Sequence, residues 1–338
     1  MRHESRDGCM ESIMASCRIE AHEGRGLGIS RRKIAVIGAG NVGATCAFEL
    51  AKMSFAHIVM LDIFEGFAKG KALDMSQTGQ VLNFDGRVCG TSDYDDIAGS
   101  DVIVVTSGFP RKPGMSREDL IGKNADIISQ VGAGIRDHAP DATIVMVTNP
   151  LDLMTYHMQK VTGFPYERVV GQAGILDSAR MTHFVADAVG CSEEDVQAMV
   201  LGGHGDTMVP LPRYTTVGGI TIDQLLDDET IAAICERTAK GGGEIVKLLE
   251  RGSAFYAPGA AAAVMAEAII NDRKRLLPCS AHLSGQYGLD DVYIGVPVIL
   301  GKEGVERIIE LELTQEEAAS LQGSGNFYKS QLSELLGY

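Results

Sequence analysis

The stretch GAGNVG, residues 38–43, restricts the possible folds of this chain more than any other feature. It follows directly on an apolar run, and its glycines occupy the three fixed positions of a G-x-G-x-x-G turn. In such a turn the first glycine allows a tight reversal, the second lets the backbone approach a pyrophosphate, and the third lets the next helix pack against the sheet. The pattern predicts a strand, a turn and a helix that together bind a dinucleotide.

An acidic residue stands where this type of turn needs one. Asp62 ends the next apolar run, about 20 residues after the turn, and a carboxylate at that place hydrogen-bonds ribose hydroxyls. The same carboxylate repels a 2′-phosphate, so the sequence favours NAD over NADP as cofactor. The alternative interpretation is an ordinary glycine turn with an unrelated surface aspartate.

Further short apolar runs follow along the first half of the chain, at residues 57–62, 101–108 and 143–149. Because these runs are continuous rather than alternating, we expect strands that are covered on both faces, as in a parallel sheet with crossover helices. The predicted fold class is α/β, with a Rossmann-type doubly wound parallel sheet followed by a mixed α+β substrate domain. Ligands of such sheets bind beyond the carboxyl ends of the strands.

Pro150 marks the expected boundary between two domains. We expect residues 31–150 to form the NAD-binding domain, residues 151–338 to form the substrate-binding, catalytic domain, and residues 1–30 to form a disordered extension without the apolar stretch of a secretory signal. The second half contains several patterns of helices and strands. They predict a helix at 177–189, a strand at 196–203, a helix at 260–270, a strand pair around 291–300 and a final helix capped by Thr314 with Glu317.

The composition disfavours several classes of partner. With 30 Lys+Arg against 45 Asp+Glu the net charge is −15, which opposes binding to nucleic acid or to an anionic membrane surface. No apolar run approaches the roughly 20 residues that cross a bilayer. The 7 cysteines show no C-x-x-C spacing, which argues against a zinc site or a disulfide framework. We expect a soluble, cytoplasmic protein without a metal.

His204 lies between glycines in the stretch GGHGDTMVP, directly after an apolar run. A lone histidine often has a structural role, but small neighbours allow this imidazole to face a ligand. Because the pKa of histidine is ordinarily near 6.5, the ring can accept and return a proton around neutrality. Asp177, in GILDSAR, is a candidate to hold the other ring nitrogen, and Asp206 is a rival for the same role.

Arg180 follows Asp177 by three residues, so the two share one face of a predicted helix. Its guanidinium is a planar fork that binds a carboxylate through two parallel hydrogen bonds. An ion pair on a solvated surface is the equally weighted alternative.

The stretch GFPRKPGMSR, residues 108–117, follows the apolar run at 101–108 and therefore lies at the ligand-binding edge of the predicted sheet. Gly108 and Gly114 bound a loop that can close over a bound molecule and exclude water. Arg111 and Arg117 are its candidate anion-binding residues. Solubilising surface charge is the alternative.

Four motifs in this order are together more specific than any one of them: GAGNVG, VTNP, GILDSAR and GGHGDT. With them the chain resembles the lactate/malate dehydrogenase family from Arg31 onward, and it looks most like the malate dehydrogenases that are close to lactate dehydrogenase. The resemblance implies NAD as cofactor. The positions that match the family's cofactor site are Gly38, Ala39, Gly40, Asn41, Val42, Gly43, Asp62, Asn124, Val147, Thr148 and Asn149.

The same resemblance implies a role for each candidate residue of the substrate site. It implies His204 as the proton acceptor and Asp177 as its partner. It also implies that Arg117 polarises the substrate carbonyl and that Arg180 grips the neighbouring carboxylate. Asn149 completes the substrate site. A catalytically silent NAD-binding sensor is expected to have lost at least one of four of them, and all four are present: His204, Asp177, Arg117 and Arg180.

Arg111 bears on the choice of substrate. Lactate-specific relatives carry an amide-type residue at the matching loop position, whereas an arginine suits a second carboxylate. Those relatives also carry an acidic residue where this chain has Met115, and a larger threonine where it has Ala254. The resemblance thus implies reversible oxidation of (S)-malate to oxaloacetate by a homodimer or homotetramer. The alternatives are an L-lactate or other 2-hydroxyacid dehydrogenase and, more remotely, an NAD-dependent glycoside hydrolase.

Overall fold

The computed structural model describes residues 32–109 and 117–338. The predicted N-terminal extension, Arg111 and Met115 lie outside the described residues. None of the helices in these two ranges is both long and apolar enough to cross a bilayer.

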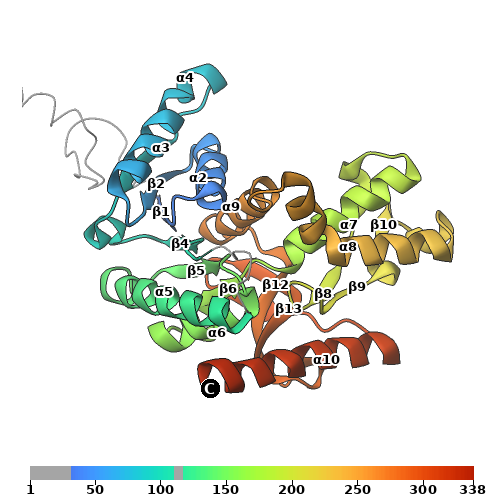
Figure 1. Ribbon diagram of the computed structural model, residues 1–338. Helices are drawn as coiled ribbons and strands as arrows, with labels where there is room; N and C mark the ends of the chain where they lie inside the picture. The colour runs from blue at the N-terminus through green and yellow to red at the C-terminus, as the bar shows by residue number, and fades with distance from the viewer. Residues whose placement is uncertain (1–31, 110–116) are drawn as a thin grey trace, which may run out of the picture.

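The first six strands form the parallel part of one large sheet (Figure 1). Every neighbouring pair among them is parallel. Their order in space is β3-β2-β1-β4-β5-β6, which reverses between β1 and β4 and creates a switch point where ligands bind. The predicted doubly wound sheet is therefore confirmed. The strands are β1 (Arg32–Ile37), β2 (Ala56–Leu61), β3 (Arg87–Thr91), β4 (Val102–Val105), β5 (Thr143–Met146) and β6 (Val169–Gly171).

Helices cover both faces of these strands. α2 (Asn41–Lys52) and α9 (Tyr256–Ile270) lie on one face, and α5 (Arg117–His138) and α6 (Leu151–Thr162) lie on the other (Figure 1). Because of this double cover, β4 and β5 are buried along their whole length. Gly259 lets the predicted alanine-rich helix α9 approach α2 closely, since a Cβ there would lie 2.6 Å from a side chain of α2.

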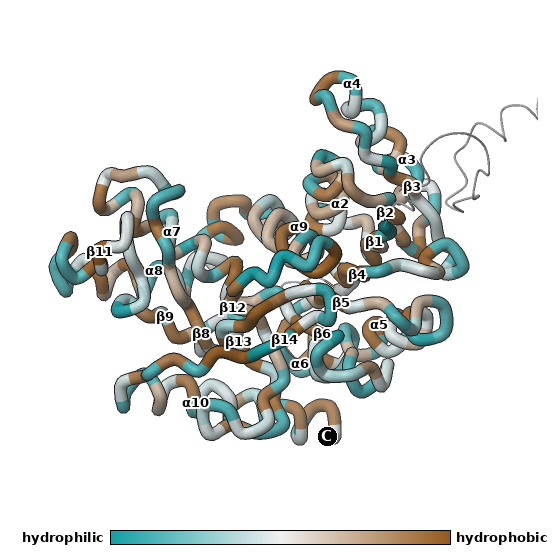
Figure 2. The backbone as a smooth tube through the Cα atoms, turned by 180° about the vertical axis from the view of Figure 1, so that it is seen from behind, coloured by the Kyte–Doolittle hydropathy of each residue, from teal (hydrophilic) through white to brown (hydrophobic). Residues whose placement is uncertain are grey.

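Antiparallel strands extend the same sheet beyond β6, and Figure 2 shows hydrophobic stretches along them. The predicted strand pair is β12 and β13. The extension consists of β12 (Arg275–Ser284), β13 (Asp290–Gly301), β14 (Gly304–Ile308), β8 (Val200–Gly202) and β9 (Met208–Pro210). A separate three-stranded sheet consists of β7 (Val196–Gln197), β10 (Thr216–Val217) and β11 (Ile220–Thr221). The remaining helices are α3 (Glu65–Gln77), α4 (Gly79–Leu82), α7 (Gly174–Val189), α8 (Asp228–Leu249) and α10 (Gln315–Gln331).

The strand predicted at residues 196–203 is a correction, because the structure divides it between two sheets. β7 pairs with β10, whereas β8 pairs with β9 and β13. The side chains of Val196 and Val200 pack in a small core below α7, while Leu201 packs in the main core. Because β7 and β8 pair with strands of two different sheets, the run breaks at residues 198–199.

The predicted cap of the last helix is confirmed. Thr314 Oγ1 accepts from the backbone N–H of Glu317, and the Glu317 carboxylate accepts from the N–H of Thr314 at 2.8 Å. The variant Thr314→Ala should lose about 1 kcal/mol of unfolding free energy, because an orphan donor of the first turn loses its partner. Urea denaturation measures the loss. Ser330→Ala, near the other end of the same helix, is the control and should lose nothing, so equal losses would contradict the capping role.

Candidate active site

The turn between β1 and α2 needs its glycines. Gly38 has a φ of +103°, and a Cβ on Gly43 would lie 1.9 Å from the carbonyl oxygen of Gly38. A Cβ on Gly40 would meet nothing within 4 Å, so the backbone there is open to a ligand. α2 begins at Asn41 without a side-chain cap, which leaves its first amide groups available to an anion. The turn therefore fits the pyrophosphate of a dinucleotide.

Two charged side chains hold this turn in place. Asp62, at the end of β2, accepts from the backbone N–H of Ala39 at 2.8 Å and from that of Phe64 at 3.0 Å. Lys71 of α3 donates to the carbonyl oxygen of Ala39 at 2.8 Å. Burial lowers the pKa of Lys71, and the negative charge of Asp62 opposes this effect. Sequence reasoning identified Asp62 but missed Lys71, whose contact joins residues that are distant along the chain.

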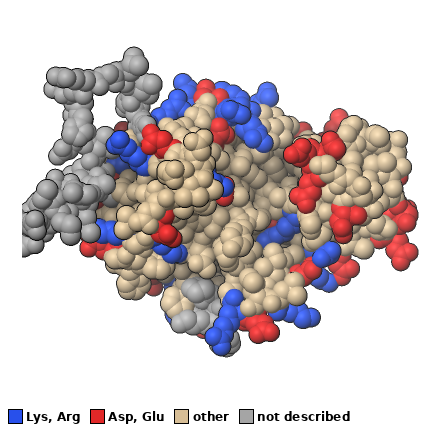
Figure 3. All heavy atoms as spheres, turned by 90° about the horizontal axis from the view of Figure 1, so that it is seen from above, with Lys and Arg blue, Asp and Glu red and all other residues tan. Residues whose placement is uncertain are grey.

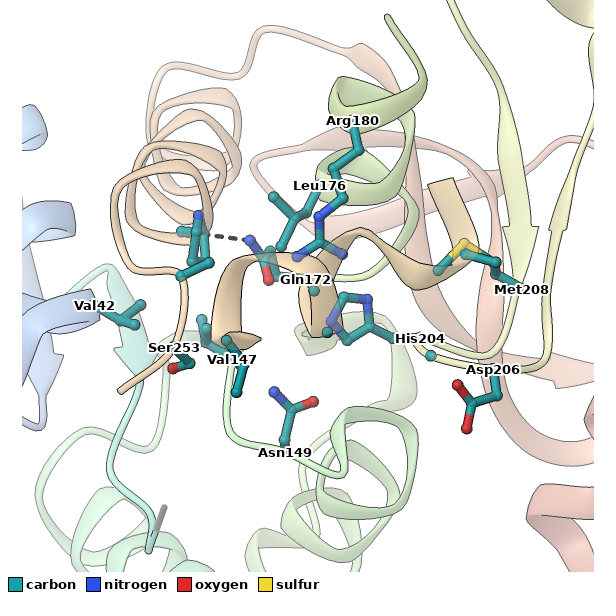
Figure 4. A pocket seen from close by; sticks show the side chains of 17 residues that line it. Val42, Val147, Asn149, Gln172, Leu176, Arg180, His204, Asp206, Met208 and Ser253 are labelled. Atoms are coloured by element: carbon teal, nitrogen blue, oxygen red, sulfur yellow. Dashed lines mark hydrogen bonds between the residues drawn. The ribbon is translucent and has the colours of Figure 1, made fainter. Parts of the chain in front are cut away.

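A cavity of about 500 Å³ opens near the ends of β5 and β8, between α7, α8 and α9. Figure 4 shows Arg180 and His204 side by side in it, with Asn149 across from them. Ala254, whose small size the sequence analysis noted, is also in the wall. The remaining walls consist of Val42, Val147, Gln172, Leu176, Gly205, Asp206, Met208, Ala239, Gly242, Gly243, Val246, Ser253 and Pro258.

The imidazole of His204 is held by a carboxylate from α7. His204 Nδ1 lies 2.9 Å from Asp177 Oδ2, and the Asp177 side chain is 2% exposed. Because an ionised carboxylate only accepts hydrogen bonds, Nδ1 carries the donated proton, and Nε2 is the ring nitrogen that Asp177 does not engage. Asp206, the rival partner, also lines the cavity, but the hydrogen bond of the ring goes to Asp177.

The charges around His204 change its proton affinity. Burial by itself would lower the pKa of His204, and the nearby guanidinium of Arg180 acts in the same direction. The carboxylates of Asp177 and Asp152 outweigh both effects and raise the pKa above its ordinary value. The ring therefore binds a second proton more readily than an ordinary histidine does.

Arg180 reaches the cavity because α8 offers it no side chains at the point of contact. Arg180 Nη1 donates to Asp177 Oδ1 at 3.0 Å, and the Arg180 side chain is 14% exposed. A Cβ on Gly241 would lie 3.1 Å from Arg180 Cδ, and one on Gly242 would lie 3.5 Å from Nη2. The pairing with Asp177 is thus a partly buried one that leaves other guanidinium donors available to a ligand.

The protein around the cavity is acidic, so the positive charge of Arg180 matters for binding an anion there. Red acidic side chains gather over the lobe of α7, α8 and the short strands, at the right of Figure 3. Exposed carboxylates of the lobe include Asp187, Glu193, Glu194, Asp223 and Asp228. Of the lysines and arginines that the structure describes, Arg180 alone lines the cavity. An anion that enters must be recognised locally, against the general charge of the protein.

The remaining predicted residues have different positions. Val147 and Asn149 line the cavity, whereas Asn124 and Thr148 do not. Asn124 Oδ1 accepts from the N–H of Phe109, Nδ2 donates to the carbonyl of Asn149, and both distances are 2.6 Å. Thr148 Oγ1 donates to a backbone carbonyl at 2.7 Å. Both side chains therefore brace the backbone at the ends of β4 and β5. Arg117 begins α5.

Sequence reasoning also missed two residues that shape the site. Gln172 Nε2 donates to the carbonyl of Pro258 at 3.0 Å (dashed in Figure 4), and this bond joins the end of β6 to α9. Asp152 accepts from the backbone N–H of His204 at 2.9 Å. The signal for Asp152 is its place, just after VTNP and in the first turn of α6, where a fully buried carboxylate needs hydrogen-bond donors.

The site combines two features. A dinucleotide-binding turn lies at the switch point of the sheet, and beyond the strand ends a histidine and an arginine contact one buried carboxylate. Together they define a pyridine-nucleotide-dependent oxidoreductase. The chain belongs to the lactate/malate dehydrogenase family. Residues 32–171 match the domain described as "lactate/malate dehydrogenase, NAD binding domain", so NAD is the cofactor. Residues 175–336 match the "lactate/malate dehydrogenase, alpha/beta C-terminal domain". The resemblance noted in the sequence is thereby confirmed.

Similar proteins carry both names of the family. Over 306 residues the chain is 55% identical to "Malate dehydrogenase 1" of Anaeromyxobacter dehalogenans, covering 90% of this chain and 98% of that protein. Among solved structures, malate dehydrogenase from Salinibacter ruber has a TM-score of 0.86 and 51% identity, covering 90% of this chain and 97% of that one. Lactate dehydrogenase from Cryptosporidium parvum, complexed with lactic acid and the cofactor, has a TM-score of 0.88 and 42% identity, covering 92% and 99%.

Proposed function

We propose that this protein catalyses the reversible, NAD-dependent oxidation of (S)-malate to oxaloacetate. The observation that carries the proposal is the joint contact of His204 and Arg180 with buried Asp177 in one cavity, in a chain 55% identical to a malate dehydrogenase. The proposed cofactor contacts are those of the turn at residues 38–43, Asp62, Asn124 and residues 147–149. NAD, when bound, accepts the hydride from the carbon that carries the hydroxyl group.

The residues of the cavity have distinct proposed roles. His204 Nε2 removes the hydroxyl proton, while Asp177 keeps the ring in the required tautomer and stabilises the imidazolium that forms. Arg180 binds the carboxylate next to the reacting carbon through its planar fork. Arg117 polarises the oxygen that changes between hydroxyl and carbonyl, and Asn149 completes the substrate site. In the reverse direction His204 must begin protonated, which its raised pKa favours.

The choice of malate over lactate depends on Arg111, which is proposed to bind the second carboxylate. The family includes enzymes of both names, so the fold alone does not distinguish them. The test is to follow NADH oxidation with oxaloacetate and with pyruvate at equal concentrations of enzyme and substrate. A strong preference for oxaloacetate is expected. A preference for pyruvate would support the alternative, an L-lactate or other 2-hydroxyacid dehydrogenase.

The variant Arg111→Gln should lose much of this preference. Without the guanidinium the distal carboxylate of oxaloacetate has no cationic partner, and the ratio of kcat/KM values for oxaloacetate and pyruvate should fall by about 30-fold, which is roughly 2 kcal/mol. The measurement is kcat/KM for both substrates. Arg251→Gln, an exposed arginine outside the cavity wall, is the control and should keep the wild-type ratio. An unchanged ratio in Arg111→Gln would assign the selectivity to another residue.

We also propose that the enzyme is a cytoplasmic homodimer or homotetramer, with an NAD-binding domain at residues 31–150 and a substrate domain at residues 151–338. Large apolar side chains support association, because α3, α4 and the segment before them expose Phe64, Phe67, Val81 and Leu82. Sedimentation equilibrium tests the assembly, and a monomer at assay concentrations would contradict it.

A further inference from the structure

Asp152 contacts His204 from outside the cavity. The Asp152 residue is 1% exposed and is absent from the cavity wall. Its Oδ2 accepts from the backbone N–H of His204 at 2.9 Å, and its Oδ1 accepts from the hydroxyl of Ser280 at 2.7 Å. Asp152 lies in the first turn of α6 and Ser280 lies in β12, so the carboxylate joins two elements of the main core to the segment that carries the histidine.

We propose that Asp152 is a positioning residue that sets both the place and the charge state of His204. The inference rests on the function proposed above, because the charge state of His204 matters only if this ring exchanges a proton with the substrate. Asp152 does not line the substrate cavity, and its hydrogen bonds go to Ser280 and to the backbone of His204, so its contact with the site is through His204.

The positioning half of the role follows from the backbone around His204. The ring is carried by a glycine-rich segment in which Gly202 has a φ of +84° and Gly205 a φ of +139°. Such a segment has large conformational freedom and needs external anchors. Two described side chains supply them: Ser324 of α10 accepts from the N–H of Gly203 at 3.0 Å, and Asp152 accepts from the N–H of His204.

The effect of Asp152 on the charge state of His204 follows from the charged groups that face the ring. Asp177 and Arg180 come from α7, Asp206 lies on the segment of His204 itself, and Tyr328 of α10 packs against Gly203. The α8 and α9 residues in the cavity wall are not titratable. Arg180 lowers the pKa of His204, and Asp152 adds to the opposing effect of Asp177.

Asp152 itself remains able to carry this charge. Burial, with the like charge of Asp177, raises the pKa of the Asp152 carboxyl overall, while the donors from Ser280 and from the His204 backbone favour its ionised form and oppose this shift. Both oxygens already accept hydrogen bonds, as an ionised carboxylate requires. A neutral side chain of the same shape would keep the anchor and remove the charge, so the two halves of the role are separable.

The decisive variant is Asp152→Asn, because the amide oxygen can still accept from the N–H of His204. Loss of the negative charge lowers the pKa of His204 by roughly one unit, the lower end of the effect of a nearby charge. The alkaline limb of kcat/KM for oxaloacetate reduction and the acid limb of kcat/KM for malate oxidation both report the pKa of His204, so both should move to lower pH by about one unit. Because the overall equilibrium constant is fixed, the two kcat/KM values should change by the same factor at each pH while the affinities for NAD and NADH stay at the wild-type values. Steady-state measurements of kcat/KM as a function of pH, in both directions, locate these limbs, the pH ranges over which each activity falls.

The movement of both limbs to lower pH is the critical readout. Damage to the site that is only structural would lower both kcat/KM values at every pH and leave the limbs where they are in the wild type, and that result would overturn the inference. Asp187→Asn is the matched control, because it removes the same charge from an exposed position of α7, and its limbs should not move.

A second variant keeps the test informative if Asp152→Asn does not fold. Ser280→Ala removes one of the two donors that stabilise the carboxylate, and should move both limbs to lower pH by a smaller step. Unmoved limbs in Ser280→Ala, in the absence of a folded Asp152→Asn, would also overturn the inference. Failure of the wild type to use either oxaloacetate or malate would instead overturn the proposed function.

Discussion

Replacement of His204 by asparagine is expected to lower kcat by about 10²–10⁴-fold in both directions, the range that a positioned general acid–base supplies. An asparagine amide can still donate to Asp177, so the buried carboxylate keeps a partner and the fold should persist. What the amide lacks is a group that binds and releases a proton near neutrality. Steady-state assays of malate oxidation and oxaloacetate reduction measure the loss.

The affinity for NADH separates this effect from general damage. His204 lies away from the glycine turn, so the fluorescence titration of NADH should give a Kd like that of the wild type. His183→Asn is the matched control, because His183 lies on α7 with its side chain 61% exposed and pairs with Glu193. It should keep wild-type kinetics. A His204→Asn enzyme that retains more than one-tenth of the wild-type kcat would exclude His204 as the proton acceptor.

The parallel half of the fold was predictable because its signals are local. A run such as Val102–Val105 is apolar at every residue, and this is the pattern of a strand with helices on both faces. The glycine turn could be predicted as well, because each of its three glycines is required for a separate steric reason. The cap at Thr314 depends on two residues in one turn. None of these features requires knowledge of a distant contact.

Contacts between distant segments were not predictable from the residues alone. The sequence left Asp177 and Asp206 as rival partners of His204, and the distance of 2.9 Å to Asp177 depends on how α7 lies beside β8. Asp152 was missed for the same reason, because its donors come from His204 and Ser280, far along the chain. Only the tertiary structure brings these residues together.

The helix α8 was missed for a different reason. Residues 241–243 are three consecutive glycines in its second half, and each costs about 1 kcal/mol relative to alanine in a helix. Propensity therefore argues against a helix that the structure has. The missing side chains of Gly241 and Gly242 are what leave room for Arg180. Departures from local preference of this kind concentrate at functional sites.

The variant Arg180→Lys should therefore be severe although it keeps the charge. Lysine cannot present two parallel donors to a carboxylate, and its ammonium cannot serve Asp177 and a substrate in the same geometry. We expect kcat/KM for oxaloacetate to fall by about 30-fold to several thousand-fold, corresponding to roughly 2–5 kcal/mol for one partner of a buried pair. Most of the change should appear in KM, because the carboxylate is bound in both the ground state and the transition state.

Arg237→Lys is the control for this change, because Arg237 lies on the exposed side of α8 and pairs with Glu244. It should leave kcat/KM at the wild-type value, since exposed ion pairs contribute little. NADH affinity should be unchanged in both variants. An Arg180→Lys enzyme with the wild-type KM for oxaloacetate would mean that Arg180 only supports Asp177, and that the substrate carboxylate is bound by another residue.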